Sequence, residues 1–295
     1  MTTKKKTPPF RGIGTALVTP FCDGRVDLAC FRRTVARQIA GGVSALVVAG
    51  TTGEAVTLRG SERAALLAAA VEESAGRLPV IAGTGCADTR AAVAASRYAA
   101  SHGADALLVV TPYYNKGTRE GIVTHYLTIA EAVDVPIILY NVPSRTGVDL
   151  SPALLSELAE HENIVAIKEA SGSIDRCADL VAAFGDQLLL YSGNDGELLP
   201  TLAVGGIGLI SVISNLLPEE TAAIYRLFTE GHTGEAAALA SRLLPLCRAM
   251  FAEVNPAPIK YAMACRGLIR PEARLPLTMP GTEVRARIEQ LLAEQ

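Results

Sequence analysis

One lysine in this sequence directly follows a run of apolar residues that is typical of a buried strand. Lys168 comes after residues 163–167, Asn-Ile-Val-Ala-Ile. A lysine at such a strand end is partly removed from water, which disfavours its charged form, and a neutral amine can attack a carbonyl carbon to form an imine. A purely structural role stays open at this point, because Lys168 could instead pair with Glu54, Glu169 or Asp195. The other lysines lie in the N-terminal segment, in a polar loop and near the C-terminus: Lys4, Lys5, Lys6, Lys116 and Lys260.

Polar side chains that could assist a lysine imine follow other apolar runs. Tyr140 ends the run at 137–140, which is expected to form the strand adjacent to the one before Lys168, so the two side chains should lie close together. A tyrosine can carry protons during imine and carbanion chemistry. Thr51 and Thr52 stand between glycines, where hydroxyls and turn amides can hold a carboxylate. Arg145 comes shortly after Tyr140, and arginine suits bidentate binding of a carboxylate. Each residue alone also fits a structural role: a core aromatic, a common turn or a surface ion pair.

Other kinds of chemistry find little support in the sequence. The four histidines, at positions 102, 125, 161 and 232, fall in helical or helix-connecting segments, so a histidine-based metal site or triad is not expected. The six cysteines contain no Cys-x-x-Cys pair, which argues against a zinc ribbon or a thioredoxin motif. Gly205-Gly206-Ile207-Gly208 precedes an apolar run, so it is interpreted as a tight turn rather than a phosphate loop.

The elements that would position these residues alternate along the chain. Continuous apolar runs, typical of strands covered on both faces, occupy 13–18, 45–49, 80–82, 106–110, 137–140, 164–167, 188–191 and 207–211. Stretches with helical spacing of apolar residues occupy 28–40, 62–75, 89–101, 120–133, 152–160, 174–184, 196–204 and 218–229. Eight such pairs predict a closed (β/α)8 barrel, whose chemistry lies at the carboxyl ends of its strands. An open doubly wound sheet would need G-x-G-x-x-G after the first strand, but Gly12-Ile13-Gly14 lies before or inside it.

The ends of the chain are predicted to differ from the barrel. Residues 1–9 are polar and are expected to form a disordered tail, residues 10–231 the barrel, and residues 232–295 an appended bundle of helices. The helices of this bundle are expected at 235–247, 258–266 and 283–293.

Composition narrows the possible environments and partners. The 295 residues are 49% hydrophobic and carry a net charge of −3, which argues against nucleic acid and against an anionic membrane surface as binding partners.

Residues 198–218 carry no charge and are long enough to cross a bilayer. Pro200 and the glycines at 205, 206 and 208 instead predict a helix, a turn and a buried strand. No apolar stretch of the kind found in a signal peptide follows Lys4–Lys6. Without such a signal, the six cysteines are expected to be reduced thiols in a cytoplasmic protein.

Taken together, the motifs resemble those of the dihydrodipicolinate synthase family, within the wider superfamily of N-acetylneuraminate lyase and pyruvate-dependent class I aldolases. The matching pieces cover nearly all of the chain after Pro9. They include Gly50-Thr51-Thr52-Gly53-Glu54, Thr111-Pro112-Tyr113-Tyr114-Asn115-Lys116, Tyr140-Asn141-Val142-Pro143-Ser144-Arg145-Thr146-Gly147, Ile167-Lys168-Glu169-Ala170, Ser192-Gly193-Asn194-Asp195, and Asn255-Pro256.

This resemblance implies a barrel enzyme that condenses pyruvate with aspartate 4-semialdehyde to 4-hydroxy-tetrahydrodipicolinate, on the route to diaminopimelate and lysine. Lys168 would form the imine with pyruvate, and Tyr140 would move protons during imine and enamine formation. Thr51 would link Tyr140 to Tyr114 in a proton relay. No metal or organic cofactor is implied, because the lysine imine itself serves as the electron sink.

The resemblance also implies how the substrates are held and how copies assemble. Thr52 would bind the pyruvate carboxylate, Arg145 the carboxylate of the semialdehyde, and Gly193 with the Ile210 carbonyl would line the site. Tyr114 would reach into the site of a neighbouring subunit, so a dimer would be required, and the family usually forms a tetramer of two tight dimers.

The sequence departs from the family at a second pocket. In relatives that lysine inhibits, this pocket carries polar groups, including histidine, asparagine and glutamate. Here Tyr113 remains, but the other positions are Ala55, Val56, Gly60, Arg63, Ala87 and Ala91. Because Ala91 offers no acceptor for an ammonium group, the sequence predicts weak or absent inhibition by lysine.

Two alternatives remain beside the synthase. One is a related aldolase or lyase that combines pyruvate with another aldehyde, such as a sugar acid or 4-hydroxy-2-oxoglutarate. Arg145 with Tyr114 favours the synthase over these. The other is a non-catalytic regulator that binds a keto acid on the same barrel, and the intact set of Lys168, Tyr140 and Thr51 argues against it. A barrel alone would not decide, because the fold supports many chemistries.

Overall fold

The structure is a computed structural model that describes residues 5–294. Eight strands hydrogen-bond in the order β1-β10-β9-β8-β7-β6-β5-β4 and close into a barrel, which confirms the predicted (β/α)8 fold. The chain divides into two compact units. Within the described residues, one comprises 5–11 and 79–210, and the other comprises 12–78 and 211–294.

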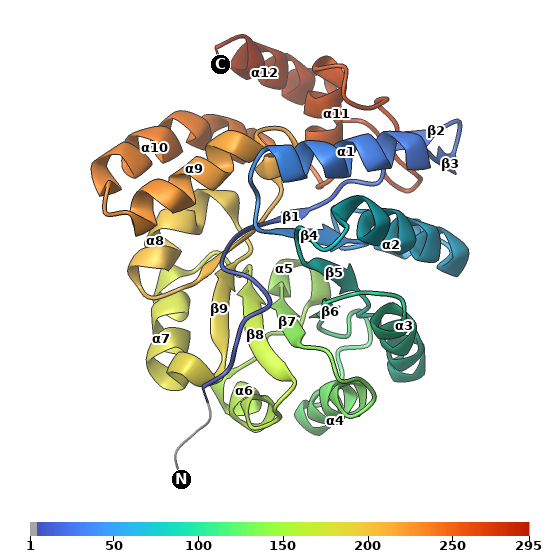
Figure 1. The fold of residues 1–295 in the computed structure, drawn as a ribbon, viewed down its shortest axis with the longest axis vertical. Helices are drawn as coiled ribbons and strands as arrows, with labels where there is room; N and C mark the ends of the chain where they lie inside the picture. Colours follow the sequence, from blue (N-terminus) through green and yellow to red (C-terminus); the bar gives the residue numbers. More distant parts are fainter. Residues whose placement is uncertain (1–4, 295) are drawn as a thin grey trace. The chain divides into compact units, whose positions relative to one another are not determined.

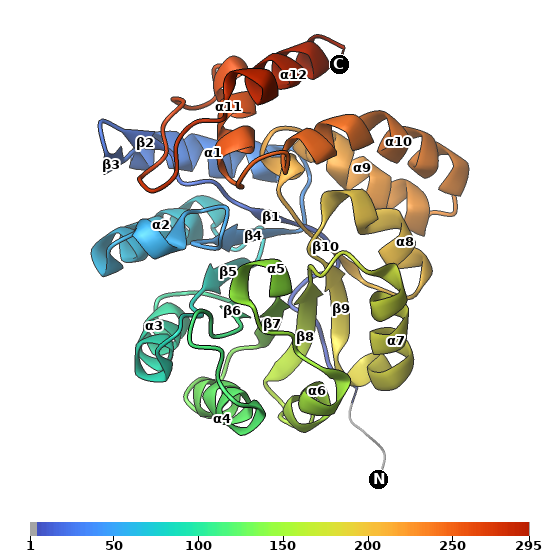
Figure 2. The same ribbon diagram turned by 180° about the vertical axis from the view of Figure 1, so that it is seen from behind.

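The first unit contains consecutive β/α repeats. Its strands are β5 (Val80–Gly83), β6 (Ala106–Val110), β7 (Ile137–Asn141), β8 (Ile164–Glu169), β9 (Leu189–Ser192) and β10 (Gly208–Ser211), the last without its final residue. Its helices are α3 (Thr89–Ser101), α4 (Arg119–Ala130), α5 (Pro143–Thr146), α6 (Pro152–Ala159), α7 (Ile174–Phe184) and α8 (Leu198–Ala203), with 3-10 turns η2 (Gly185–Gln187) and η3 (Asp195–Glu197). Helices α3, α4, α6 and α7 lie outside strands β5–β9 (Figure 1, Figure 2).

Local sequence explains these elements. The strands from β7 to β9 are buried along their whole length, as continuous apolar runs require when both faces are covered. Side-chain oxygens of Asp88, Thr118, Ser151 and Ser173 accept backbone N–H bonds at the starts of α3, α4, α6 and α7. Such caps satisfy amide groups that the first helical turn leaves unpaired.

The second unit holds the first barrel strands and the C-terminal helices. Its strands are β1 (Gly12–Ala16), β4 (Ala45–Val48) and a small hairpin of β2 (Phe21–Cys22) and β3 (Arg25–Val26). Its helices are α1 (Leu28–Ala40), α2 (Gly60–Ser74), α9 (Pro218–Thr229), α10 (Thr233–Ala249), α11 (Ala257–Cys265) and α12 (Thr282–Ala293), with 3-10 turns η1 (Ala55–Thr57) and η4 (Ile213–Asn215). Helices α9 and α10 lie side by side, as do α11 and α12 (Figure 1).

Most predicted segments are found with shifts of one to three residues at their ends. The hairpin β2–β3 and the short helix α5 were not predicted. The uncharged stretch 198–218 forms α8, a turn, β10 and η4, as the helix–turn–strand interpretation expected. Within residues 5–294, no helix is both long enough and apolar enough to cross a membrane.

The predicted N-terminal tail falls partly outside the described residues, which begin at Lys5. Lys6 donates hydrogen bonds to the carbonyl oxygens of Ala159, His161 and Ile164, at 2.5, 2.9 and 2.6 Å. Burial lowers the pKa of Lys6 to about 8. Lys6 lies in the segment expected to be disordered, but it makes specific hydrogen bonds within the first unit. The predicted boundary at 231/232 lies in the turn between α9 and α10.

Candidate active site

Lys168 and Tyr140 lie side by side at the carboxyl ends of adjacent strands. Lys168 in β8 pairs in register with Tyr140 in β7. Both side chains are buried, Lys168 with only 5% of its surface exposed. The Lys168 Nζ atom lies 4.3 Å from the centre of the Tyr140 ring. The expectation that these two residues are neighbours is therefore confirmed, and an amine that is largely shielded from water lies over the face of a phenol ring.

Gly193, just after β9, forms part of the wall beside Lys168. Its N–H donates to the Glu169 carbonyl at 2.6 Å. A Cβ atom at this position would lie 3.1 Å from Lys168 Cε and 2.6 Å from Ala170 Cβ. Only a residue without a side chain fits here without displacing its neighbours, so Gly193 contacts the stem of the candidate nucleophile.

Glu169, the residue after Lys168, is fully occupied by other partners. Its carboxylate accepts the Ser171 N–H at 2.7 Å, the Asn141 side-chain amide at 2.9 Å and the Arg176 Nε–H at 2.8 Å. Asp149 joins the same cluster by accepting from Asn141 and Arg176. This network fixes the ends of β7 and β8 behind Lys168 and Tyr140.

Two of the structural partners considered for Lys168 form ion pairs with other residues. Glu169 pairs with Arg176, and Glu54 pairs with Lys260. No ion pair among residues 5–294 includes Lys168. Arg176 was not among the predicted site residues, because its contact with Glu169 is made from the next helix and has no short sequence signature.

Tyr114 and Arg145 lie on the loops that follow β6 and β7. Tyr114 has a left-handed backbone with φ of 72° and is 89% exposed. Arg145 is an exposed residue of α5. Lys116, from the Tyr114 loop, lies over the end of α5, since its Cε would be 2.6 Å from a Cβ on Gly147. The two loops therefore approach each other. The aromatic ring of Tyr114 is exposed to solvent in the single chain.

Ile210 is the third residue of β10 and is fully buried. The preceding residue, Leu209, pairs with Ser192 of β9, directly before Gly193. Because β9 and β10 are parallel, Ile210 comes one residue after this pair, at the level of Gly193.

Thr51 and Thr52 belong to the second unit, in a tight turn after β4. Backbone hydrogen bonds join Gly53 N–H to the Gly50 carbonyl and Glu54 N–H to the Thr51 carbonyl, at 3.1 and 3.0 Å. Thr52 is 3% exposed, and its Oγ1 accepts from Asn255 Nδ2 at 3.0 Å. The turn is therefore held by backbone hydrogen bonds and by a side-chain hydrogen bond to Asn255.

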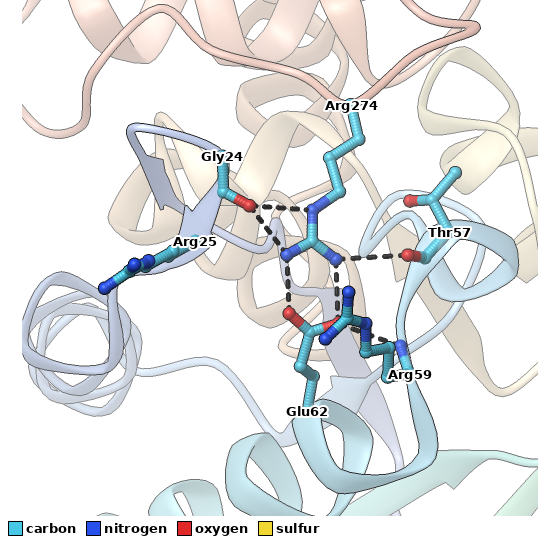
Figure 3. Close-up of a pocket in the computed structure, with 6 residues that line it drawn as sticks. All are labelled: Gly24, Arg25, Thr57, Arg59, Glu62 and Arg274. Atoms are coloured by element: carbon cyan, nitrogen blue, oxygen red, sulfur yellow. Dashed lines mark hydrogen bonds and ion pairs between the residues drawn. The ribbon is translucent and has the colours of Figure 1, made fainter.

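A surface depression of about 510 Å³ lies elsewhere in the second unit (Figure 3). Its lining residues are Gly24, Arg25, Thr57, Arg59, Glu62 and Arg274. The Arg274 guanidinium is engaged by Glu62 and by the carbonyls of Gly24 and Thr57. These bonds use all five N–H groups of an arginine, so Arg274 is a structural clamp.

The histidines stay away from the strand ends. His125 lies in α4, where its Nδ1 is 2.9 Å from Thr89 Oγ1, and burial lowers its pKa to about 4. His102, His161 and His232 lie in or beside helix ends, as predicted. No group of three or more His, Cys, Asp or Glu side chains within residues 5–294 is arranged to hold a metal ion.

The fold and this geometry define a class of protein: a (β/α)8 barrel with a buried lysine at the carboxyl end of its sixth strand in chain order, β8, beside a tyrosine. The sequence model of the Dihydrodipicolinate synthetase family matches residues 9–295. The chain belongs to this family.

Individual relatives agree over almost the whole chain. The 4-hydroxy-tetrahydrodipicolinate synthase of Syntrophobacter fumaroxidans is 45% identical over 282 residues, covering 95% of this chain and 97% of the relative. The enzyme of the same name from Hyphomonas neptunium is 47% identical over 286 residues, covering 96% and 98%. The crystal structure of a chloride-inhibited dihydrodipicolinate synthase from Acinetobacter baumannii complexed with pyruvate is 40% identical, with a TM-score of 0.94, covering 96% and 98%.

Proposed function

We propose that this chain is a lyase that condenses pyruvate with L-aspartate 4-semialdehyde to 4-hydroxy-tetrahydrodipicolinate, through an imine on Lys168. The observation that carries the proposal is the buried Lys168 amine, 4.3 Å from the ring centre of Tyr140 and outside every ion pair of residues 5–294. The relatives named as synthases, at 45% and 47% identity over nearly full length, support the same reaction.

The proposed chemistry begins with attack of the Lys168 amine on the pyruvate C2 carbonyl. Loss of water gives the imine, and loss of a proton from C3 gives an enamine, whose carbon then attacks the aldehyde of the second substrate. The amino group of that substrate displaces Lys168 and closes the ring, so that one water is released overall. Tyr140, whose ring lies against the Lys168 amine, carries the protons in this proposal. No metal or organic cofactor takes part in this proposal, because the protonated imine accepts the electron pair.

The proposal assigns the remaining residues by charge and position. Thr52 and the neighbouring amides of its turn bind the pyruvate carboxylate, and Arg145 binds the carboxylate of the semialdehyde. Thr51 links Tyr140 to Tyr114 in a proton relay. Gly193 and the Ile210 carbonyl line the site.

Tyr114 supports an oligomer as part of the proposal. Tyr114 is 89% exposed in the single chain. Its side chain would be buried if it entered the active site of a second copy. We propose a homodimer as the catalytic unit, assembled in pairs into a tetramer. The reaction is biosynthetic and we place it in the cytoplasm, where the free cysteines stay reduced.

Two measurements test the proposal. Borohydride reduction in the presence of pyruvate should attach the three-carbon acid to Lys168, and Lys168→Ala should abolish the adduct. A coupled reductase assay should then show turnover of pyruvate with aspartate semialdehyde. An adduct on Lys168 without condensation would identify a related aldolase with another aldehyde. Labelling of a different lysine would refute the assignment of Lys168, and absence of any adduct would refute the imine.

A further inference from the structure

The turn that carries Thr51 and Thr52 ends in a buried ion pair. Glu54 has a left-handed backbone with φ of 55°, a conformation that disfavours residues with a side chain. Its Oε1 lies 2.5 Å from Lys260 Nζ in helix α11, and neither side chain is exposed to solvent. A buried carboxylate at a strained backbone position therefore depends on an ammonium group from a helix about 200 residues further along the chain.

The second oxygen of Glu54 is also held. Its Oε2 accepts the backbone N–H of Arg274 at 2.9 Å. The side chain of Arg274 bridges the Gly24 and Thr57 carbonyls and the Glu62 carboxylate, as Figure 3 shows. One partner of the Glu54 carboxylate, Arg274, thus belongs to a clamp that ties the β2–β3 hairpin to the start of α2.

The same helical segment reaches the turn a second time. Asn255, two residues before α11, donates to Thr52 Oγ1. On the opposite side of the turn, the Thr19 hydroxyl donates to the Gly53 carbonyl at 2.7 Å. A Cβ on Gly53 would lie 3.1 Å from the Leu17 carbonyl oxygen, so the turn has no room to relax toward that side.

We propose that Lys260 and Asn255 are positioning residues for the pyruvate-carboxylate site, holding the Thr51–Thr52 turn through Glu54 and Thr52. The stretch from Asn255 to Lys260 in this sense supports the substrate site and is not only a cover for the barrel. The inference rests on the proposed role of Thr52. Neither positioning residue is proposed to touch the reacting atoms.

The physical reason is the cost of an unpaired buried charge. Removing the Lys260 ammonium leaves the Glu54 carboxylate buried without its counter-charge, which strongly favours any movement that brings it to water. Glu54 is only two residues from Thr52, so such a movement displaces the hydroxyl and amide groups of the turn. Displacements on the scale of 1 Å are enough to weaken substrate positioning substantially.

The test compares Lys260→Met, which keeps an unbranched side chain only one atom shorter and removes its charge, with Leu291→Ala. Leu291 is buried in α12, so its truncation destabilises the C-terminal helices without touching the turn. For Lys260→Met, we expect the KM for pyruvate to rise at least tenfold and the KM for the semialdehyde to stay within twofold. Borohydride trapping on Lys168 at saturating pyruvate should persist. Leu291→Ala should lower Tm with both KM values unchanged.

The double variant Glu54→Gln/Lys260→Met separates positioning from general damage. If the two groups act as one unit, its pyruvate KM should match or fall below that of Lys260→Met instead of showing the product of both single effects. A folded Lys260→Met with pyruvate KM within twofold of wild type overturns the inference. An equal rise of both KM values, shared by Leu291→Ala, overturns it as well.

Asn255→Ala carries the test if Lys260→Met does not fold, because it removes the hydrogen bond to Thr52 and leaves the ion pair in place. A rise of at least threefold in pyruvate KM supports the inference, and an unchanged KM overturns it. Failure of the proposed function has a different signature, since wild type itself would then show no pyruvate adduct on Lys168.

Discussion

A single methyl group added at Gly193 should damage the candidate site while leaving its polar residues intact. In Gly193→Ala, the new Cβ would lie 2.6 Å from Ala170 Cβ, 3.0 Å from the Glu169 carbonyl oxygen and 3.1 Å from Lys168 Cε. All three neighbours belong to β8 or the loop after it, and the Ala170 Cβ and the Glu169 carbonyl oxygen are fixed to the backbone. The strain therefore cannot be relieved by rotating one flexible side chain. Either the Gly193 loop or the Lys168 stem must move.

The size of the effect follows from those distances. The contact with Ala170 is well inside ordinary van der Waals separation, and overpacking of this kind costs about 1–3 kcal/mol of stability. A displacement of Lys168 approaching 1 Å lowers the rate by up to about 100-fold, which corresponds to about 2.7 kcal/mol in the barrier. We therefore expect kcat/KM for condensation to fall by about 10- to 100-fold.

Gly234→Ala is the matched control. Gly234 lies in the first turn of α10, where a methyl group on its Cα would meet no neighbouring atom within 4 Å, and alanine favours a helix over glycine by about 1 kcal/mol. The control should be fully active and equally or more stable. The assays are the coupled reductase reaction and urea unfolding of both variants. A Gly193→Ala protein with wild-type kcat/KM would refute the close packing of Gly193 against Lys168 as a feature of the working site.

Three further outcomes are expected. Tyr114→Phe, which removes only a hydroxyl, should lower kcat at least tenfold with an unchanged unfolding curve, and full turnover would remove Tyr114 from the relay. Lysine at 1 mM should leave the initial rate of the wild-type enzyme within about 10%, because Ala55, Ala87 and Ala91 offer no side-chain acceptor; an inhibition constant of about 1 mM or tighter would contradict this. The hydrogen bond from Arg274 lowers the pKa of Glu62 to about 2, below its unfolded value, so the stabilisation exists above about pH 5 and is lost as the pH falls toward 2. In urea unfolding at pH 7, Glu62→Gln should be less stable than wild type by at most about 3 kcal/mol, and by less than that because the pair is partly exposed to solvent. The difference in unfolding free energy should shrink by pH 3. A difference that does not depend on pH would refute the ion pair as its source.

The barrel could be predicted because its strands leave a simple trace in the sequence. Strands buried on both faces are continuous apolar runs, and β8 is such a run at Ile164–Ile167, followed by two buried charged residues, Lys168 and Glu169. The hairpin β2–β3 leaves no such trace, since each strand has two residues and includes Cys22 or Arg25. Propensity and periodicity need longer segments than this.

Neighbours across adjacent strands could also be predicted. Parallel strands that follow each other in the chain bring their carboxyl ends together, and this rule alone places Tyr140 beside Lys168. The Glu169–Arg176 network could not be predicted in this way, because it joins a strand to the face of a helix. The rotation of that helix is set by packing, which the sequence pattern alone does not determine.

Lys260 marks the limit of sequence reasoning most clearly. In the sequence it is one lysine in a C-terminal helical segment, and lysines in helices are usually solvated. The structure buries it completely against Glu54 and over the Phe21 ring, 4.2 Å from its centre. Burial lowers the pKa of Lys260, while Glu54 acts in the opposite direction. An isolated lysine would not stay charged in such a place, so the identity of residue 260 makes sense only with residue 54, and the pattern of neither segment reveals the other. The residues that hold a catalytic turn can therefore lie far from it in the chain and carry no motif, and only the folded structure shows which positions they are.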